Sequence, residues 1–179
     1  MKLNQLIHWR LEGTPDVFTE KRDGETWQVI HSGGAIHDAG FLQTVYFDKL
    51  VKEITLWVCV SLFSPGGGLA LRLGIDPHSG ADPQSSKIIW GSWYAPENEW
   101  VASQPGWIQH TLGNLQSYGV TVFLQSKCLY PVKANTSRWR DVQLKIEYVG
   151  TEPEPPGPDP DPDQGIAGEV VQVLDEITQ

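Results

Sequence analysis

The chain has 179 residues, of which 40% are hydrophobic and eight are tryptophan, and this is enough apolar surface for one ordinary domain. The net charge of −9 is unevenly distributed: residues 150–179 carry eight acidic residues and no basic ones, which leaves 14 acids against 13 bases in residues 1–149. A nearly neutral body lacks the basic stripe that supplies affinity for phosphate backbones, so nucleic acid is excluded as the expected partner.

A hydrophobic period of two dominates residues 1–149. Its clearest example, Ile54 to Phe63, is β-branched and aromatic, and it ends at the turn sequence Ser64-Pro65-Gly66-Gly67-Gly68. In chain order, we predict short strands at residues 27–30, 41–47, 54–63, 69–75, 87–93, 107–112, 118–125 and 139–148. Short strands with turn residues between them, and with no convincing amphipathic helix, predict an all-β antiparallel sandwich, and the number of strands favours a jelly roll.

The composition changes at Gly150. Residues 150–164 are rich in proline and acidic residues, which predicts an extended linker between a β-sandwich module at 1–149 and a short apolar segment at 165–179. The apolar residues of that last segment are Ile166, Val170, Val171, Val173, Leu174 and Ile177. Their spacing suits a short amphipathic helix or a strand, and so short a helix is marginal by itself. We therefore predict docking onto a neighbouring copy, a larger assembly or another domain, with a frayed tail or linker as the alternative.

Cysteine content and the N-terminus bear on the cell compartment. Cys59 falls in a predicted strand and Cys128 lies near the end of one, and they allow either two separate buried or half-buried thiols or one bridge between neighbouring strands. The first ten residues contain no signal-peptide pattern, and no segment reaches the roughly 18 apolar residues of a membrane span. The sequence thus predicts cytoplasmic synthesis without a membrane span, and a virion surface is one destination.

Several motifs follow one another in residues 28–146. They are Ala39-Gly40-Phe41-Leu42, Leu73-Gly74-Ile75-Asp76-Pro77, Gly80-Ala81-Asp82-Pro83 and Trp139-Arg140-Asp141-Val142. This series resembles the carbohydrate-binding-module-like, galactose-binding-like jelly-roll domains. The resemblance implies a sandwich fold and a sugar- or surface-binding role, although such folds also serve as purely structural modules.

The same resemblance implies a structural calcium ion. Modules of this kind frequently hold calcium between the first and last strands, through an early glutamate and a closing acid, which would be Glu12 and Asp141 here. Calcium takes about six to eight oxygen ligands, and Arg140 stands where these modules often have a second acid. The alternative for Asp141 is to cap a turn or to pair with a surface base.

Aromatic residues crowd into residues 90–107, where amides and carboxylates are interleaved with them. A sugar ring presents C–H groups to an aromatic face and hydroxyls to amides and carboxylates, so this segment is a candidate saccharide platform. The predicted ligand-binding residues are Tyr94, Trp100 and Asn98, followed by Trp93 and Glu97. In the alternative, Trp90 and Trp107 belong to the core, and Trp93 and Trp100 hold the loop against the body.

Catalytic motifs are missing from the sequence, which contains no Gly-x-Ser-x-Gly, His-Glu-x-x-His or phosphate-binding glycine pattern. A metal site at His31 and His37, with Asp38 adjacent, is not expected, because isolated histidines in turns usually form hydrogen bonds. We expect a non-enzymatic module that binds a glycan or polysaccharide. The alternative is a structural or decorating component of a larger assembly such as a virus particle, attached to a capsid or to neighbouring copies through its C-terminal tail.

Overall fold

The computed structural model describes residues 1–65, 67–95, 105–131 and 134–150. These residues form nine strands and no helix. The strands are β1 (Ile7–Glu12), β2 (Asp16–Arg22), β3 (Glu25–His31), β4 (His37–Phe63), β5 (Leu69–Asp76), β6 (Ile89–Trp90), β7 (Gly106–Leu112), β8 (Ser117–Cys128) and β9 (Thr136–Tyr148). The chain divides into two units, residues 1–149 and 150–179. Apart from Gly150, the predicted linker and docking segment lie outside the described residues.

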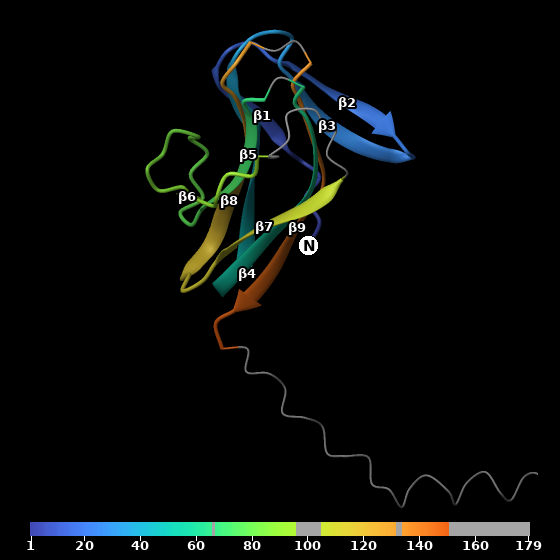
Figure 1. The fold of residues 1–179 in the computed structure, drawn as a ribbon. Coiled ribbons are helices and arrows are strands. Elements are labelled where there is room, and N and C mark those ends of the chain that lie inside the picture. Colours follow the sequence, from blue (N-terminus) through green and yellow to red (C-terminus); the bar gives the residue numbers. More distant parts are fainter. Residues whose placement is uncertain (66, 96–104, 132–133, 151–179) are drawn as a thin grey trace, which may run out of the picture. The chain divides into compact units, whose positions relative to one another are not determined.

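Strand β4 is 27 residues long, and through it all nine strands join in one hydrogen-bonded sheet. The parts of this sheet on the two halves of β4 are called the first and the second sheet below. The first part of β4, from His37 to Tyr46, pairs with β1 and β8, and β5 and β6 continue this first sheet. Its second part, from Val51 to Phe63, pairs with β7 and β9, and β3 and β2 continue this second sheet (Figure 1). The register shifts between Tyr46 and Val51, where the strand passes from one sheet to the other.

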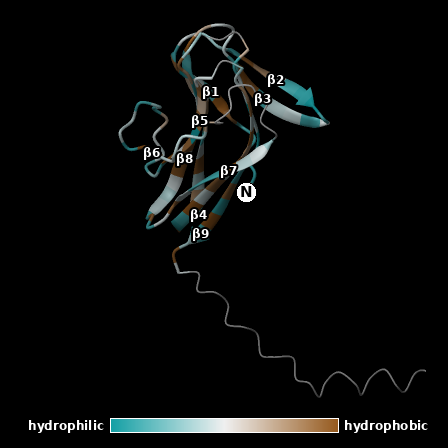
Figure 2. Ribbon diagram, in the orientation of Figure 1, coloured by the Kyte–Doolittle hydropathy of each residue, from teal (hydrophilic) through white to brown (hydrophobic). Residues whose placement is uncertain are grey.

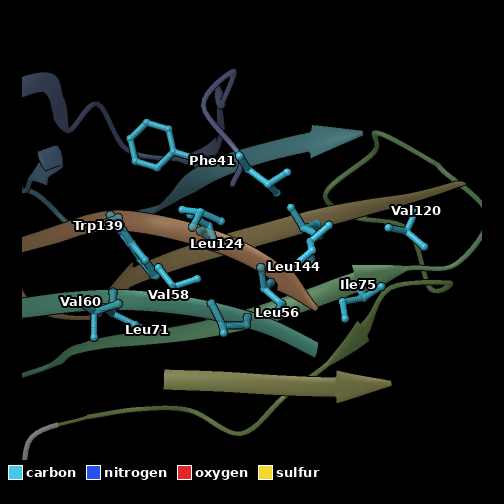
Figure 3. Packing of buried hydrophobic residues seen from close by; sticks show 14 of the residues in the cluster. Phe41, Leu56, Val58, Val60, Leu71, Ile75, Val120, Leu124, Trp139 and Leu144 are labelled. Carbon is cyan, nitrogen blue, oxygen red and sulfur yellow. The ribbon is translucent and has the colours of Figure 1, made fainter. Parts of the chain in front are cut away.

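One hydrophobic core lies between the two sheets. Successive residues of a strand point to opposite faces, so every second side chain of the central strands is turned inward. Leu71 and Leu124 of the first sheet belong to the same buried cluster as Leu56 and Trp139 of the second (Figure 3). Figure 2 shows hydrophobic residues along the central strands and a hydrophilic end on β2. The predicted antiparallel β-sandwich is confirmed.

The predicted strands differ from the observed ones in three respects. Strands β1 and β2 were not predicted, because most of their side chains are exposed and the hydrophobic period of two is weak there. The strands predicted at 41–47 and 54–63 are parts of the single strand β4. The strand predicted at 87–93 is reduced to Ile89–Trp90, after which residues 91–94 follow β5 through hydrogen bonds to Leu73 and Leu71.

Both cysteines are buried free thiols, which confirms the first of the two interpretations given above. Cys59 packs with Trp27 and Val29 on the outer side of the second sheet. The sulfur of Cys128 accepts a hydrogen bond from the Asn135 side chain, 3.1 Å away. In the part of the chain that the structure describes, there is no helix that could cross a membrane.

Candidate functional site

The outer face of the first sheet carries a second, smaller group of buried side chains. Trp9, Leu42, Ile88 and Phe123 form this cluster, and Trp90 packs against it. The side chains of β5 and β8 that point away from the main core contribute polar groups to the same face. The register places Gln125 of β8 directly opposite Arg72 of β5 and Gly40 of β4.

Arg72 lies between two tryptophan rings. Its guanidinium carbon is 4.1 Å from the centre of the Trp90 ring and 4.2 Å from that of Trp93. Both distances are within the range of cation–π attraction. Gly74 makes room for this arrangement, because a Cβ atom at Gly74 would lie 2.6 Å from the Trp90 ring. We call Trp90, Arg72 and Trp93 the arginine–tryptophan stack.

A chain of hydrogen bonds fixes Arg72 across three strands. Its Nε donates to Oε1 of Gln125 at 2.5 Å, and Nε2 of Gln125 donates to Oδ1 of Asp38 at 2.5 Å. The Lys127 Nζ lies 3.6 Å from the other oxygen of Asp38. Burial lowers the pKa of Arg72, and the Asp38 carboxylate opposes this shift, so the guanidinium keeps its charge inside the stack. The base of the site is therefore held by side chains from β4, β5 and β8.

Trp93 is the exposed member of the stack, with 43% of its surface accessible. The neighbouring backbone is fixed, because Tyr94 and Leu71 exchange two backbone hydrogen bonds of 2.7 and 2.8 Å. One side of Trp93 borders a hollow of about 310 Å³, lined also by Ala70, Lys127 and Leu129. A rigid, half-exposed indole beside an apolar hollow with one amine is suited to contact a ring that has both C–H and hydroxyl groups.

A second hollow of about 690 Å³ lies between residues 90–94 and β7, and Trp93 borders it as well. The hydrogen bond that crosses from β7 to β6 joins the two edges, because Nε2 of His110 donates to the carbonyl oxygen of Ile89 at 3.0 Å. Gln109 and Thr111 of β7 also line this hollow. Trp93 thus lines both hollows.

The residues that the sequence predicted to bind the ligand have different surroundings in the structure. Trp93 is part of the stack, whereas Tyr94 is half-buried and packs against the main core. Glu97, Asn98 and Trp100 lie outside the described residues. The alternative placed Trp90 and Trp107 in the core. Trp90 is only half-buried and packs against the outer cluster, and the core position for Trp107 was wrong, because 52% of its surface is exposed.

The two residues predicted to bind calcium lie in different strands. Glu12 lies at the end of β1, opposite Asp38 of the first sheet. Asp141 lies in β9 of the second sheet, where Lys2 is 2.7 Å and Arg140 is 3.2 Å from its oxygens. Asp141 therefore pairs with bases, as in the alternative given above, and the calcium ion remains a prediction.

His31 and His37 take part in separate hydrogen bonds. Nε2 of His37 lies 3.0 Å from the Ser126 hydroxyl, and Nδ1 of His31 lies 2.9 Å from the Thr136 hydroxyl. Burial lowers the pKa of His37 from 6.5 to about 4, so its ring is neutral at pH 7. Within the described ranges, no three Asp, Glu, His or Cys side chains are close enough together to hold a metal ion.

Sequence reasoning did not identify Arg72 or Gln125. A signal for Arg72 was present in Leu69-Ala70-Leu71-Arg72-Leu73-Gly74, where alternate leucines point inward and the arginine stands between two small residues on the other face. Small neighbours leave space for rings above the sheet. The pairing of Gln125 with Arg72 depends on which strands are adjacent, and the order of strands was not evident from the sequence.

No family model matches the chain, and no curated protein matches it either. Solved structures do match. The xylan-binding module CBM15 aligns with a TM-score of 0.53 and 14% identity, over 83% of this chain and 96% of that one. A CBM61 module in complex with β-1,4-galactotriose aligns with a TM-score of 0.51 and 10% identity, over 80% of this chain and 89% of that one.

A third similar structure belongs to a larger protein. The enzymatically active domain of tailspike protein 4 from bacteriophage CBA120 aligns with a TM-score of 0.50 and 10% identity, over 80% of this chain and 19% of that one. At these identities the likeness concerns the fold. The chain thus has the jelly-roll β-sandwich fold of carbohydrate-binding modules, as the resemblance in residues 28–146 implied.

Proposed function

We propose that the chain is a non-catalytic module that binds a polysaccharide or cell-surface glycan on the outer face of its first sheet. The observation that carries this proposal is the half-exposed Trp93 ring, stacked on Arg72 and bordered by two hollows. One face of the indole packs on the guanidinium, which leaves the other side for the C–H groups of a sugar ring. Lys127 and the polar groups of β7 stand on either side to bind hydroxyls.

The absence of a catalytic function is part of this proposal. Glycosidases use a pair of carboxyl groups beside the scissile bond. Neither hollow beside Trp93 has an Asp or Glu among its described lining residues. Asp38 lies nearby, but its two oxygens face Gln125 and Lys127. The fold likeness to carbohydrate-binding modules supports the same conclusion.

Substitution of Trp93 tests the function. In Trp93→Ala, we expect the Kd for a retained polysaccharide to rise roughly 30-fold, because loss of a central aromatic anchor costs about 2 kcal/mol of binding free energy. The measurement is affinity electrophoresis of the full-length protein in gels containing soluble xylan or β-1,4-galactan, followed by calorimetry with the retained polymer. These probes are chosen from the ligands named for the two similar modules.

A matched control is Tyr118→Ala, which removes an exposed aromatic ring of another strand, 59% accessible. Its retention should equal that of the wild type. The melting temperature of both variants should stay within a few degrees of the wild type, since neither ring belongs to a buried cluster. Unchanged polymer affinity in a folded Trp93→Ala protein would rule out the stack as the binding platform.

A further inference from the structure

The outer face of the second sheet carries two exposed tryptophans. Trp57 of β4 is 39% accessible and Trp107 of β7 is 52% accessible. Cys59 lies opposite Trp107 and two residues beyond Trp57, so the two indoles occupy diagonal positions on neighbouring strands. Residues at diagonal positions on neighbouring antiparallel strands are about 7–8 Å apart. This places two rings on one face without contact to the main core cluster.

Amides stand on both sides of Trp57. The residue directly opposite it on β7 is Gln109, and the residue directly opposite it on β9 is Gln143. Both glutamines are exposed. An indole in register with an amide on each neighbouring strand offers a flat apolar surface with hydrogen-bond donors and acceptors at its two edges. We call Trp57, Trp107, Gln109 and Gln143 the Trp57 surface.

The Trp57 surface itself is uncharged, and its charged neighbours Arg140 and Lys145 are paired with acids. Arg140 lies 3.2 Å from both Glu25 and Asp141. Lys145 lies 3.9 Å from Glu147. An uncharged surface of rings and amides complements a neutral ligand that has both C–H and hydroxyl groups.

The Trp57 surface is continuous with the site on the first sheet. Gln109, which lies opposite Trp57, also lines the larger hollow beside Trp93, together with Thr111. Strand β7 therefore lies between the arginine–tryptophan stack and the Trp57 surface, and its Gln109 belongs both to this surface and to the lining of the hollow beside the stack. A ligand chain that leaves the hollow over β7 meets Trp107 and Trp57 next.

We propose that the Trp57 surface is a second saccharide-binding site, which takes a neutral, extended polysaccharide chain. This inference rests on the proposed glycan-binding function and adds to it: one molecule contacts the polymer at two places, and the two contacts reinforce each other by effective concentration. A short oligosaccharide occupies either site separately. A long chain engages both, so its affinity exceeds that of either site.

The test is a titration of the full-length protein followed by the indole N–H signals in nuclear magnetic resonance spectra. β-1,4-Galactotriose and a xylo-oligosaccharide are the probes, and the signals are assigned with single Trp→Phe variants. We expect the oligosaccharide to shift the indole N–H signal of Trp93 and, at a second and independent site, the signals of Trp57 and Trp107. The double variant Trp57→Ala/Trp107→Ala should bind soluble polymer at least tenfold more weakly while the Trp93 shifts persist.

Gln143→Ala serves as a second variant, because its exposed side chain contributes little to folding. It should weaken the Trp57 and Trp107 shifts and leave those of Trp93 unchanged. Tyr118→Ala is the matched control. Shifts confined to Trp93, with wild-type polymer affinity in the double variant, would overturn the second site and leave the proposed function intact. Absence of any shift and of any polymer retention would overturn the proposed function and the second site together.

Discussion

At the scale of single residues, Arg72 shows why the stack requires arginine. Its guanidinium is planar, so it can lie against the Trp90 and Trp93 rings while Nε in the same plane donates to Gln125. A lysine ammonium has no plane to stack and would bind Gln125 from a flexible stem. The hydrogen bonds through Gln125 to Asp38 then fix the position of the guanidinium. Trp93 is held in place before any ligand arrives, which lowers the entropy cost of binding.

His37 makes the stability of the fold sensitive to acid. Its pKa is lowered to about 4 in the folded chain by burial, against 6.5 for the free side chain. Between these values the unfolded chain binds a proton that the folded chain does not, so the free energy of unfolding falls as the pH falls from 6.5 to 4. The full loss in the free energy of unfolding is about 3 kcal/mol. Urea unfolding at pH 7.0 and near pH 4 measures it.

The variant His37→Gln isolates this contribution, because the glutamine amide can both donate to and accept from the Ser126 hydroxyl and does not titrate. Its loss of stability between the two pH values should be smaller than that of the wild type by about 3 kcal/mol. His78→Gln, in the turn after β5, is the control and should follow the wild type. Equal losses in His37→Gln and the wild type would show that carboxylates elsewhere cause the acid sensitivity.

At the scale of strands, the close approach of β1 to β4 depends on Gly40. Trp9 lies opposite Gly40 in the register. A Cβ atom at Gly40 would be 1.9 Å from the Leu124 carbonyl oxygen and 2.6 Å from the Trp9 ring. Glycine within a strand often marks such a close approach. Here it lets an indole from the edge strand cover the sheet and close the outer cluster.

Gly40→Ala should therefore lower the free energy of unfolding by about 3 kcal/mol, because the strand pairing with β8 must open to admit the methyl group. The measurement is chemical denaturation at pH 7. Gly113→Ala is the matched control, since the nearest atom to its Cβ would be the end of the Glu53 side chain at 3.3 Å. A Gly40→Ala protein as stable as Gly113→Ala would mean that β1 and β8 shift apart at little cost.

The strands also show which parts of the fold and the site were predictable from the sequence. The strands at 69–75 and 118–125 were recognisable because leucine, isoleucine or valine recurs at every second position there. Strand β2 was missed because its side chains are mostly exposed. Trp93 was found because aromatic residues cluster around it. The Trp57 surface was missed because Trp57 lies within an apolar run, where a buried and an exposed tryptophan look alike.

At the scale of the molecule, the sandwich places two aromatic surfaces on the outer faces of different sheets. The stack contains residues of β5 and β6 and is held by hydrogen bonds from β4 and β8. The Trp57 surface contains residues of β4, β7 and β9. These residues lie far apart in the chain, and their proximity follows from strand order. Strand β4 serves both sheets, so it supplies Asp38 to one site and Trp57 to the other. Alternation along each strand was predictable, but the neighbours of each strand were not.

The C-terminal segment is the part of the molecule whose role only assembly measurements can assign. The nine strands and the core found in the described residues all belong to residues 1–149, so we expect a truncation to residues 1–150 to fold with an unchanged melting temperature. We predict that light scattering after size-exclusion chromatography gives a higher mass per particle for the full chain than for the truncation, because the apolar residues at 165–179 gain by burial against a neighbour. Val173→Asp/Leu174→Asp in the full chain is the matched variant and should behave as the truncation does. Monomers in all three proteins would remove the tail from assembly and leave glycan binding as the function of the body.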